Sequence, residues 1–460
     1  MPSKTARTAC WVALACLVVP MFASYFFDDM FSTISYLFED PARTQLGWDA
    51  AGYGLYASGY SVLCVFGGLV VCGILLDKWG VRVTGSIFVG MMAAGAALVL
   101  YAITSGLAPA RSLRLAYVGC MFFGLGSEIA GTAVTRSIAK WFRHGPMALA
   151  MGLQLAIARL GTACALVLSP RLVVENAGHV YSLSETARPA VFGLGLMAAG
   201  LILWALFVAM DARFDKRKEI PDQVGNDGKG VGNDGKGDGN DGNQFRFADV
   251  LGIFKNGNFW LVGLLCVLFY SSIIAFKKFA GAILIPRFGI PAGTAGWMTS
   301  MLPFSTVVFA PLFGLLVDRR GHGTRWMILG SLLALAAHLL LALAPQGVPL
   351  FGYLAMVLLG FGYSLVPAAL WPSVPKIVPD KVLGTTFALV YWVQNLGLLA
   401  FKMIAGGILG RASEAGETRG AVAVELMFTA LCVAAVAVAL LFARSSRRHP
   451  ELALDAPNKN

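Results

Sequence analysis

Long apolar segments alternate with short polar ones along almost the whole chain. Twelve apolar segments are long enough to cross a bilayer, since a spanning helix needs about 20 residues: 10–38, 50–76, 84–105, 113–138, 146–171, 190–210, 257–285, 294–317, 326–344, 348–371, 383–408 and 421–443. They form two groups of six with a polar break between them. The pattern predicts an all-α membrane protein whose twelve transmembrane helices form two six-helix bundles.

The polar break defines the predicted domains. An N-terminal bundle over 1–210 and a C-terminal bundle over 257–443 flank a cytoplasmic linker over 211–256, and a cytoplasmic tail covers 444–460. The linker holds near-repeats of Gly, Asn and Asp, which cannot bury apolar area, so we expect it to be largely disordered. Its Asp and Asn spacing faintly resembles calcium loops but lacks the closing Glu of an EF-hand, and we expect no metal there.

Composition and charge placement agree with a membrane protein. Only 13% of the residues are Asp, Glu, Lys or Arg and 57% are hydrophobic, which excludes a soluble globular chain. With the N-terminus inside, 24 of the 36 Lys and Arg residues fall in cytoplasmic segments, 8 outside and 4 within spans. Basic residues are retained on the cytoplasmic side. The net charge of +11 therefore indicates orientation, with both termini cytoplasmic in the cell (inner) membrane, and requires no nucleic acid.

The sequence shows no pattern typical of an enzyme. Its eight cysteines lie in or beside apolar segments without metal-ligand spacing, and we find no nucleotide-binding loop or nucleophile motif. We expect no enzymatic activity, no cofactor and no metal. The expected partners are a small-molecule substrate and the lipid bilayer, while the need for an accessory subunit stays open.

A short motif is repeated in the two halves. GILLDKWGVR at 73–82 recurs as GLLVDRRG at 314–321, so that two glycines and one aspartate are each displaced by 241 residues. Glycines at these places permit a tight turn and close helix approach. The motif resembles the loop between the second and third helices of the major facilitator superfamily, which implies the fold of that superfamily for both halves.

Further segments resemble one family within that superfamily. GLGSE at 124–128, MGLQLAIARLG at 151–161, LGFGYSLVPAALWPSV at 359–374 and VQNLGL at 393–398 are similar to the major facilitator superfamily domain-containing protein 1 family. Its lysosomal members carry dipeptides, so the resemblance implies transport of small peptides. Two features depart from other branches: Cys120 stands where many members carry an arginine linked to proton coupling, and the fifth span lacks the antiporter signature.

Two charged residues near the middle of the membrane are the main candidates for substrate binding. Glu128 lies near the centre of the fourth span, and Arg159 lies about 20 Å into the fifth at 1.5 Å per residue. An ionised side chain there costs at least about 2.5–3.5 kcal/mol without a partner. The resemblance implies that Glu128 meets a peptide's ammonium group and Arg159 its carboxylate. The alternative is a structural ion pair between the two helices.

A second charged set lies on the first span of each half. Asp28 and Asp29 lie on the first span, and Lys277 and Lys278 lie on the seventh, two helices that the resemblance places in equivalent positions along the cavity. Adjacent helical residues point about 100° apart, so at most one of each pair is expected to face a narrow cavity squarely. Asp29 with Lys277 or Lys278 forms a predicted charge bridge that opens and closes with access. The alternative is solvation by the cavity without a specific role.

Aromatic and amide side chains complete the predicted binding site. The strongest candidates are Tyr25, Trp371, Trp392 and Asn395, because their faces suit varied peptide side chains. Ordinary packing or lipid contact is the alternative for each of them.

The repeated motif also predicts a gate. Asp77 precedes Arg136 by 59 residues and Asp318 precedes Lys376 by 58, so both halves place an acid and a base on the cytoplasmic side. Together with Arg82, these residues are predicted to hold the bundle ends together in the outward-open state. Near water, each pair is worth only about 0–1 kcal/mol.

The leading hypothesis is therefore a facilitator that moves dipeptides by alternating access. The first alternative is a proton-coupled symporter or exporter of another small solute, such as an organic anion or drug, with Glu128 or Asp29 as proton carrier. A non-transporting sensor or scaffold with a transporter fold is the second alternative.

Overall fold

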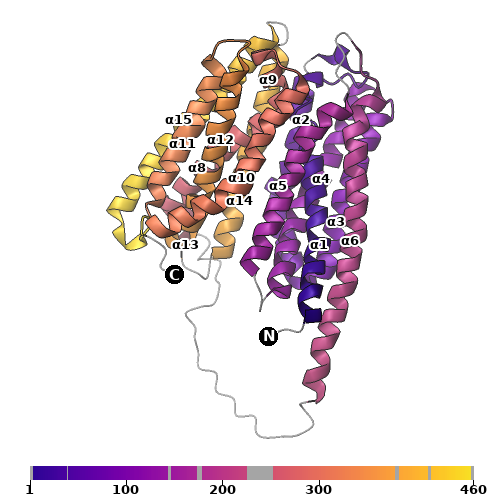
Figure 1. Cartoon of the computed structure of the whole chain (residues 1–460), viewed down its shortest axis with the longest axis vertical. Helices are drawn as coiled ribbons and strands as arrows, with labels where there is room; N and C mark the ends of the chain where they lie inside the picture. The colour runs from indigo at the N-terminus through magenta and orange to yellow at the C-terminus, as the bar shows by residue number, and fades with distance from the viewer. Residues whose placement is uncertain are drawn as a thin grey trace.

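The computed structural model describes residues 4–38, 40–142, 147–173, 179–224, 252–378, 383–412 and 416–456. These residues form two helical bundles side by side (Figure 1). The N-terminal bundle contains α1 (Lys4–Asp29), α2 (Ala50–Leu63), α3 (Leu69–Thr104), α4 (Pro109–Trp141), α5 (Met147–Leu172) and α6 (Leu183–Val224). The C-terminal bundle contains α8 (Gly257–Lys278), α9 (Ala280–Phe288), α10 (Ala292–Arg320), α11 (Gly323–Leu343), α12 (Pro349–Leu370), α13 (Val374–Ile377), α14 (Leu383–Ala412) and α15 (Glu417–Arg448).

The predicted spans are found with one exception, which the backbone explains. Among the described residues, eleven helices are long and apolar enough to cross a membrane. The second predicted span is divided, because α2 has only 14 residues and is followed by a break at Phe66 and Gly67, where φ of Gly67 is +92°. The helix resumes at Leu69 and turns at Gly80, whose φ is +73°, into the third span. The second apolar segment is present but its helix is broken, which explains why eleven spanning helices are found in the described part of the chain where twelve were predicted.

The first spans of the two bundles are also interrupted, at matching places. α1 ends at Asp29, and the chain continues through a 3-10 turn over Ser35–Phe38. α8 ends at Lys278, and α9 begins two residues later. The predicted segments 10–38 and 257–285 are therefore each two shorter elements. Each break lies directly after one of the charged pairs identified in the sequence.

The sixth helix is longer than its apolar segment. α6 continues to Val224, thirteen residues past the predicted start of the linker at 211. The Gly, Asn and Asp repeats of that linker lie outside the described residues.

The two bundles meet in the half of the molecule that lies away from the first turn of α1 and the last turn of α15 (Figure 1). There α2 packs on α14 and α5 packs on α10. The helices approach at glycines: a Cβ on Gly406 would lie 2.6 Å from the carbonyl oxygen of Ala50 and 2.8 Å from the Cα of Gly54. We call this half the closed end, and the half that carries both chain ends the terminal end.

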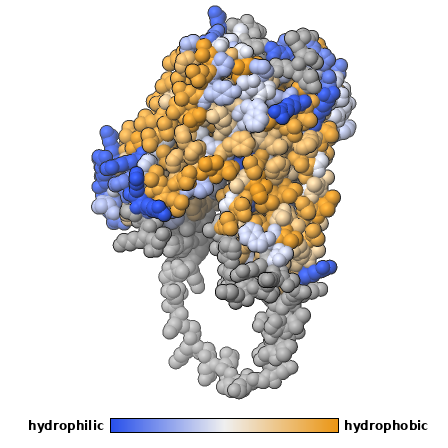
Figure 2. Space-filling model, in the orientation of Figure 1, coloured by the Kyte–Doolittle hydropathy of each residue, from blue (hydrophilic) through white to orange (hydrophobic). Residues whose placement is uncertain are grey.

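The outer surface is apolar around the middle of the molecule. Figure 2 shows hydrophobic side chains over most of the visible flank and hydrophilic ones gathered towards the ends. Large side chains such as Ile202, Leu312 and Leu350 are exposed there. Such a surface is stable only against lipid, as expected for a membrane protein.

At the terminal end, the tail folds back on the C-terminal bundle. Asp455 accepts hydrogen bonds from the backbone N–H of Thr324, at 2.9 Å, and from the hydroxyl of Ser446, at 3.0 Å. It thereby caps the first turn of α11. Lys376 donates to the carbonyl oxygens of Ala453 and Ala456.

We expect Gly406→Val to force the closed end apart. The added atoms meet the backbone of α2, and overpacking of this kind costs about 1–3 kcal/mol. Distances between spin labels at Thr135 and Arg320, both exposed near the terminal end, would then shorten as that end closes. The eight native cysteines are replaced first.

Gly407→Val is the matched control, because a Cβ on Gly407 meets nothing within 4 Å. If both substitutions leave the distance distribution unchanged, the glycine contact does not set the closed end.

Candidate functional site

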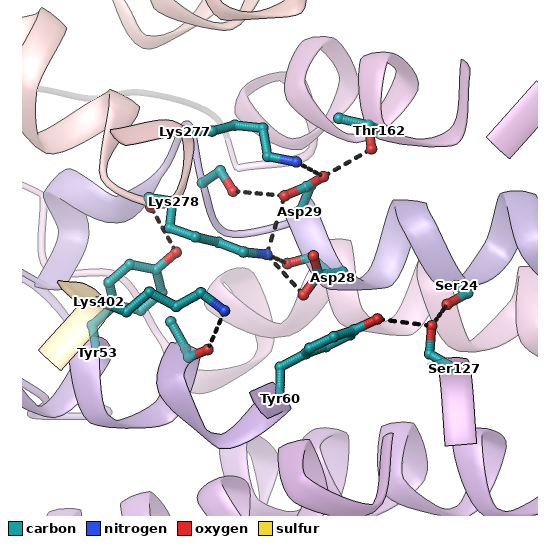
Figure 3. A network of polar contacts seen from close by, with 12 residues as sticks. Ser24, Asp28, Asp29, Tyr53, Tyr60, Ser127, Thr162, Lys277, Lys278 and Lys402 are labelled. Atoms are coloured by element: carbon teal, nitrogen blue, oxygen red, sulfur yellow. Dashed lines mark hydrogen bonds and ion pairs between the residues drawn. The ribbon is translucent and has the colours of Figure 1, made fainter. Parts of the chain in front are cut away.

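The two charged pairs form one buried cluster that joins the bundles (Figure 3). Asp29 on α1 accepts hydrogen bonds from Lys277 on α8, at 2.6 Å, and from Thr162 on α5, at 2.8 Å. Lys278 lies 3.1 Å from Asp29 and 2.8 Å from the carboxylate of Asp28. The side chain of Asp29 is only 1% exposed. We call Asp28, Asp29, Lys277 and Lys278 the bridging cluster.

Both members of each pair take part in the cluster, although helical geometry suggests that at most one of each pair faces a narrow cavity squarely. The reason is the position of the pairs, which occupy the last two residues of α1 and of α8. At a helix end the chain is free to turn, so adjacent side chains can converge on one partner.

Backbone groups freed by the two helix breaks are satisfied across the same interface. The N–H of Gly281 donates to the carbonyl oxygen of Ser32 at 3.1 Å, and the N–H of Ala282 donates to the hydroxyl of Ser35 at 3.0 Å. The hydroxyl of Tyr53 donates to the carbonyl oxygen of Lys278 at 2.8 Å. In hydrocarbon an unpaired backbone group costs several kcal/mol, so these contacts reinforce the closed end.

Glu128 and Arg159 each contact tyrosine side chains. A carboxylate oxygen of Glu128 accepts a hydrogen bond from the hydroxyl of Tyr60 at 3.1 Å. The guanidinium of Arg159 donates to the hydroxyl of Tyr363 at 3.1 Å and lies 5.7 Å from the ring centre of Tyr25. Among the described residues Glu128 and Arg159 form no ion pair with each other. The structural ion pair considered from the sequence is therefore not formed here, and each charge is half-buried with neutral partners.

Two small cavities lie against the bridging cluster. The first has about 240 Å³ of empty space, part of it open to solvent, and is lined by Arg159, Thr162, Lys277 and Tyr363 together with apolar side chains. The second has about 260 Å³ of such space and includes Asp28, Ala57 and Lys278 in its lining, with several aromatic side chains.

The predicted aromatic residues are divided between two roles. Trp371 donates to the hydroxyl of Tyr270 at 3.0 Å and stacks on Tyr391 at 4.9 Å, so it belongs to an aromatic wall that continues to Tyr363. Trp392 instead donates to the carbonyl oxygen of Val65 at 2.6 Å, at the break that follows α2. It therefore joins the two bundles.

Asn395 is the remaining predicted polar residue of this group. Its amide nitrogen donates to the carbonyl oxygen of Tyr391 at 3.1 Å, one turn earlier on α14. Its side-chain oxygen is buried without a partner among the described residues. That oxygen is free to accept a hydrogen bond from a ligand or a water molecule.

The predicted gate residues make other contacts. Arg82 lies 3.4 Å from Asp211 on α6, which also accepts from Lys140 at 2.9 Å and from the indole of Trp141 at 2.8 Å. The side chain of Asp77 lies outside the description.

The other gate residues lie at the terminal end. Lys376 is bound to the tail, as described above, within electrostatic range of Asp318. Arg136 is exposed on α4.

Sequence reasoning missed two buried acids. Asp211 was assigned to the linker, yet its side chain is 4% exposed and binds three partners. Glu425 pairs with His338 at 2.8 Å, and both side chains are fully buried between α15 and α11. Lys402 on α14 lies within a predicted span, where it could extend to the interface or pair with Asp29; it is 2% exposed and forms no ion pair with Asp29 among the described residues.

Comparison with known proteins connects this site to a family. The sequence model of the Major Facilitator Superfamily matches residues 21–286 and 276–459. The chain is 31% identical over 396 residues to the lysosomal dipeptide transporter MFSD1 of Danio rerio, covering 85% of this chain and 77% of that protein. It is 28% identical over 446 residues to MFSD1 of Homo sapiens, covering 96% and 87%.

A solved structure confirms the fold independently. The crystal structure of the nucleoside transporter NupG matches with a TM-score of 0.67 at 14% identity, over 94% of this chain and 98% of that one. At this identity the similarity concerns the fold alone. The predicted fold class is confirmed, and the chain belongs to the major facilitator superfamily of multi-pass membrane transporters, among the relatives of MFSD1.

Proposed function

We propose that this chain carries dipeptides across the membrane by alternating access, without coupling to an ion. The observation that carries the proposal is the pair of half-buried opposite charges, Glu128 and Arg159, which bind only neutral groups of the protein. A dipeptide is a zwitterion and supplies the counter-charge for both. The name of the MFSD1 relatives supports the same substrate class.

The chemistry of each side chain fits one end of a dipeptide. The planar guanidinium of Arg159 can hold a carboxylate through two parallel hydrogen bonds. The carboxylate of Glu128 can accept hydrogen bonds from an ammonium group. Tyr25, Tyr363 and Trp371 offer ring faces for varied peptide side chains without demanding one in particular.

The arrangement of the bundles supports loading from the terminal end. The bridging cluster and the approach of α2 to α14 join the bundles at the closed end, and Arg159 and Trp392 add contacts farther along the interface. With both termini in the cytoplasm, as the basic residues predict, this is the inward-open state of a protein in the cell (inner) membrane. Release on the other side requires the bridging cluster to separate while the terminal end closes. Asp77, Arg82, Arg136, Asp318 and Lys376 remain the proposed residues of that second gate.

A proton-coupled symporter or exporter is the alternative, and the partners of the two candidate carriers bear on it. Asp29 already holds two ammonium groups and a hydroxyl, so protonation there would dismantle the bridging cluster. Glu128 has a single phenol partner and is the better candidate. Uptake of Ala-Ala into proteoliposomes that is accelerated by a pH gradient would favour coupling and exclude the facilitative mechanism.

We expect Glu128→Gln and Arg159→Lys each to weaken dipeptide binding by about ten- to a hundredfold, because each removes a charge-assisted hydrogen bond or its bidentate geometry. Binding of Ala-Ala by calorimetry and uptake into proteoliposomes measure the effect. Arg411→Lys, at an exposed arginine on α14, is the control and should change neither. Normal uptake by both site variants would refute the assigned binding roles.

Blocking the ammonium or the carboxylate group of the dipeptide should have the same effect as replacing Glu128 or Arg159. We expect N-acetyl-Ala-Ala and Ala-Ala-amide each to bind at least about tenfold more weakly than Ala-Ala, because one buried charge is then left unpaired. Competition against labelled Ala-Ala measures this difference. Equal competition by blocked and free peptides would show that Glu128 and Arg159 do not bind the charged termini of the peptide.

Asp29→Asn should shift the protein towards the outward-open state. The substitution leaves Lys277 and Lys278 short of a buried carboxylate, and breaking such a pair costs about 3–5 kcal/mol. The spin-label distance between Thr135 and Arg320 should therefore shorten. Glu451→Gln, at an exposed acid of the tail, serves as control. An unchanged distance in Asp29→Asn would mean that the bridging cluster does not set the state.

A further inference from the structure

Lys402 is a buried cation that forms no ion pair with a carboxylate among the described residues. It lies on α14 and is 2% exposed. Its ammonium group donates one hydrogen bond, to the carbonyl oxygen of Ala57 at 3.1 Å, and lies 5.5 Å from the ring centre of Tyr60. An ammonium group has three donors, so two of them have no hydrogen-bonding partner among the described residues.

The charge around Lys402 is unbalanced. The bridging cluster pairs two carboxylates with two ammonium groups, and Lys402 adds a third ammonium group beside it. With Glu128 and Arg159 included, the region holds three carboxylates and four cations, which is one more positive than negative charge. In a low-dielectric interior such an excess is costly unless an anionic group arrives to balance it.

The second cavity lies beside the backbone carbonyl group that Lys402 binds. In Figure 3 the side chain of Lys402 points between the ring of Tyr60 and the Lys278–Asp28 pair. The second cavity is lined by Ala57, whose carbonyl oxygen accepts the Lys402 hydrogen bond, and by Asp28. Asp28 is engaged by Lys278, so its charge is already balanced within the cluster.

Tyr60 connects this position to the proposed substrate site. Its hydroxyl binds Glu128, and its ring faces Lys402. A ligand whose ammonium group lies on Glu128 would therefore lie beside the same tyrosine side chain that Lys402 contacts.

We propose that Lys402 is a specificity-determining residue that binds the side-chain carboxylate of dipeptides containing Asp or Glu. The proposal rests on the proposed function, in which Glu128 and Arg159 hold the two termini. Lys402 then discriminates among dipeptides by their side chains and contributes little to the binding of neutral ones.

The test compares near-isosteric substrates. Binding of Glu-Ala, Gln-Ala, Ala-Glu and Ala-Gln is measured by calorimetry on the purified full chain, for wild type, Lys402→Met and Lys402→Arg. In wild type, at least one acidic dipeptide should bind about tenfold or more tightly than its amide counterpart, as expected for a charge-assisted hydrogen bond. Lys402→Met should abolish that difference without weakening the amides, and Lys402→Arg should retain part of it.

Arg411→Met is the matched control, since it removes an exposed cation from the same helix. It should leave the preference for the acidic dipeptide intact. Thermal unfolding of each variant checks that it is folded; removing a buried charge should not destabilise Lys402→Met.

The outcomes separate this inference from the function on which it rests. If wild type binds amide dipeptides but shows no preference for acidic ones, or if Lys402→Met weakens all four dipeptides equally, the role of Lys402 is wrong and peptide transport stands. If wild type binds none of the four, the proposed function itself fails, and the inference with it. If Lys402→Met is unfolded, Lys402→Gln replaces it, and a preference for the acidic dipeptide that is unchanged from wild type in this variant would overturn the proposal.

Discussion

The pairing of charges across the two bundles is the constraint on which the rest of the structure depends. Asp28 and Asp29 belong to one bundle, and Lys277 and Lys278 belong to the other. None of them can stay ionised inside a membrane without a partner or water. Because the partners lie on separate rigid bodies, they are satisfied in only one arrangement of those bodies. The ion pairs that stabilise these buried charges therefore also stabilise the conformation in which the bundles meet at the closed end.

At the helix breaks, backbone groups also need partners from the opposite bundle. α1 and α8 both end at their charged pair, which leaves peptide groups without helical partners inside the membrane. Those groups find partners on the opposite bundle, as in the hydrogen bond from Gly281 to Ser32. Separation of the bundles must expose side-chain charges and backbone groups together. The closed end is thus held by many polar contacts that open as one, which is how a two-state conformational change arises.

Much of the fold and part of the candidate site could be predicted from the sequence. The features that could not be predicted have physical reasons. Hydropathy located the spans, and the repeated motif located the two halves, because both depend on residue type and order alone. Glu128 and Arg159 stood out because charges within spans are rare. The break at Gly67, by contrast, lies inside an apolar segment whose length suggested an intact helix. The partners of Asp211 and Lys402 depend on the depth and rotation of several helices, which apolar sequences with little periodicity do not specify.

The proposed binding site and the bridging cluster differ in one physical respect, and that difference explains how a ligand could drive the cycle. The cluster is paired within the protein, whereas Glu128 and Arg159 are bound only to phenol groups. A ligand shifts an equilibrium only by binding one state more tightly than the other. Glu128 and Arg159 lie in the N-terminal bundle, and Tyr363 and Lys402 lie in the C-terminal one. A ligand that contacts both bundles gains most when they close around it. That gain can offset the separation of the bridging cluster, so the binding energy of the substrate is available to open the opposite end.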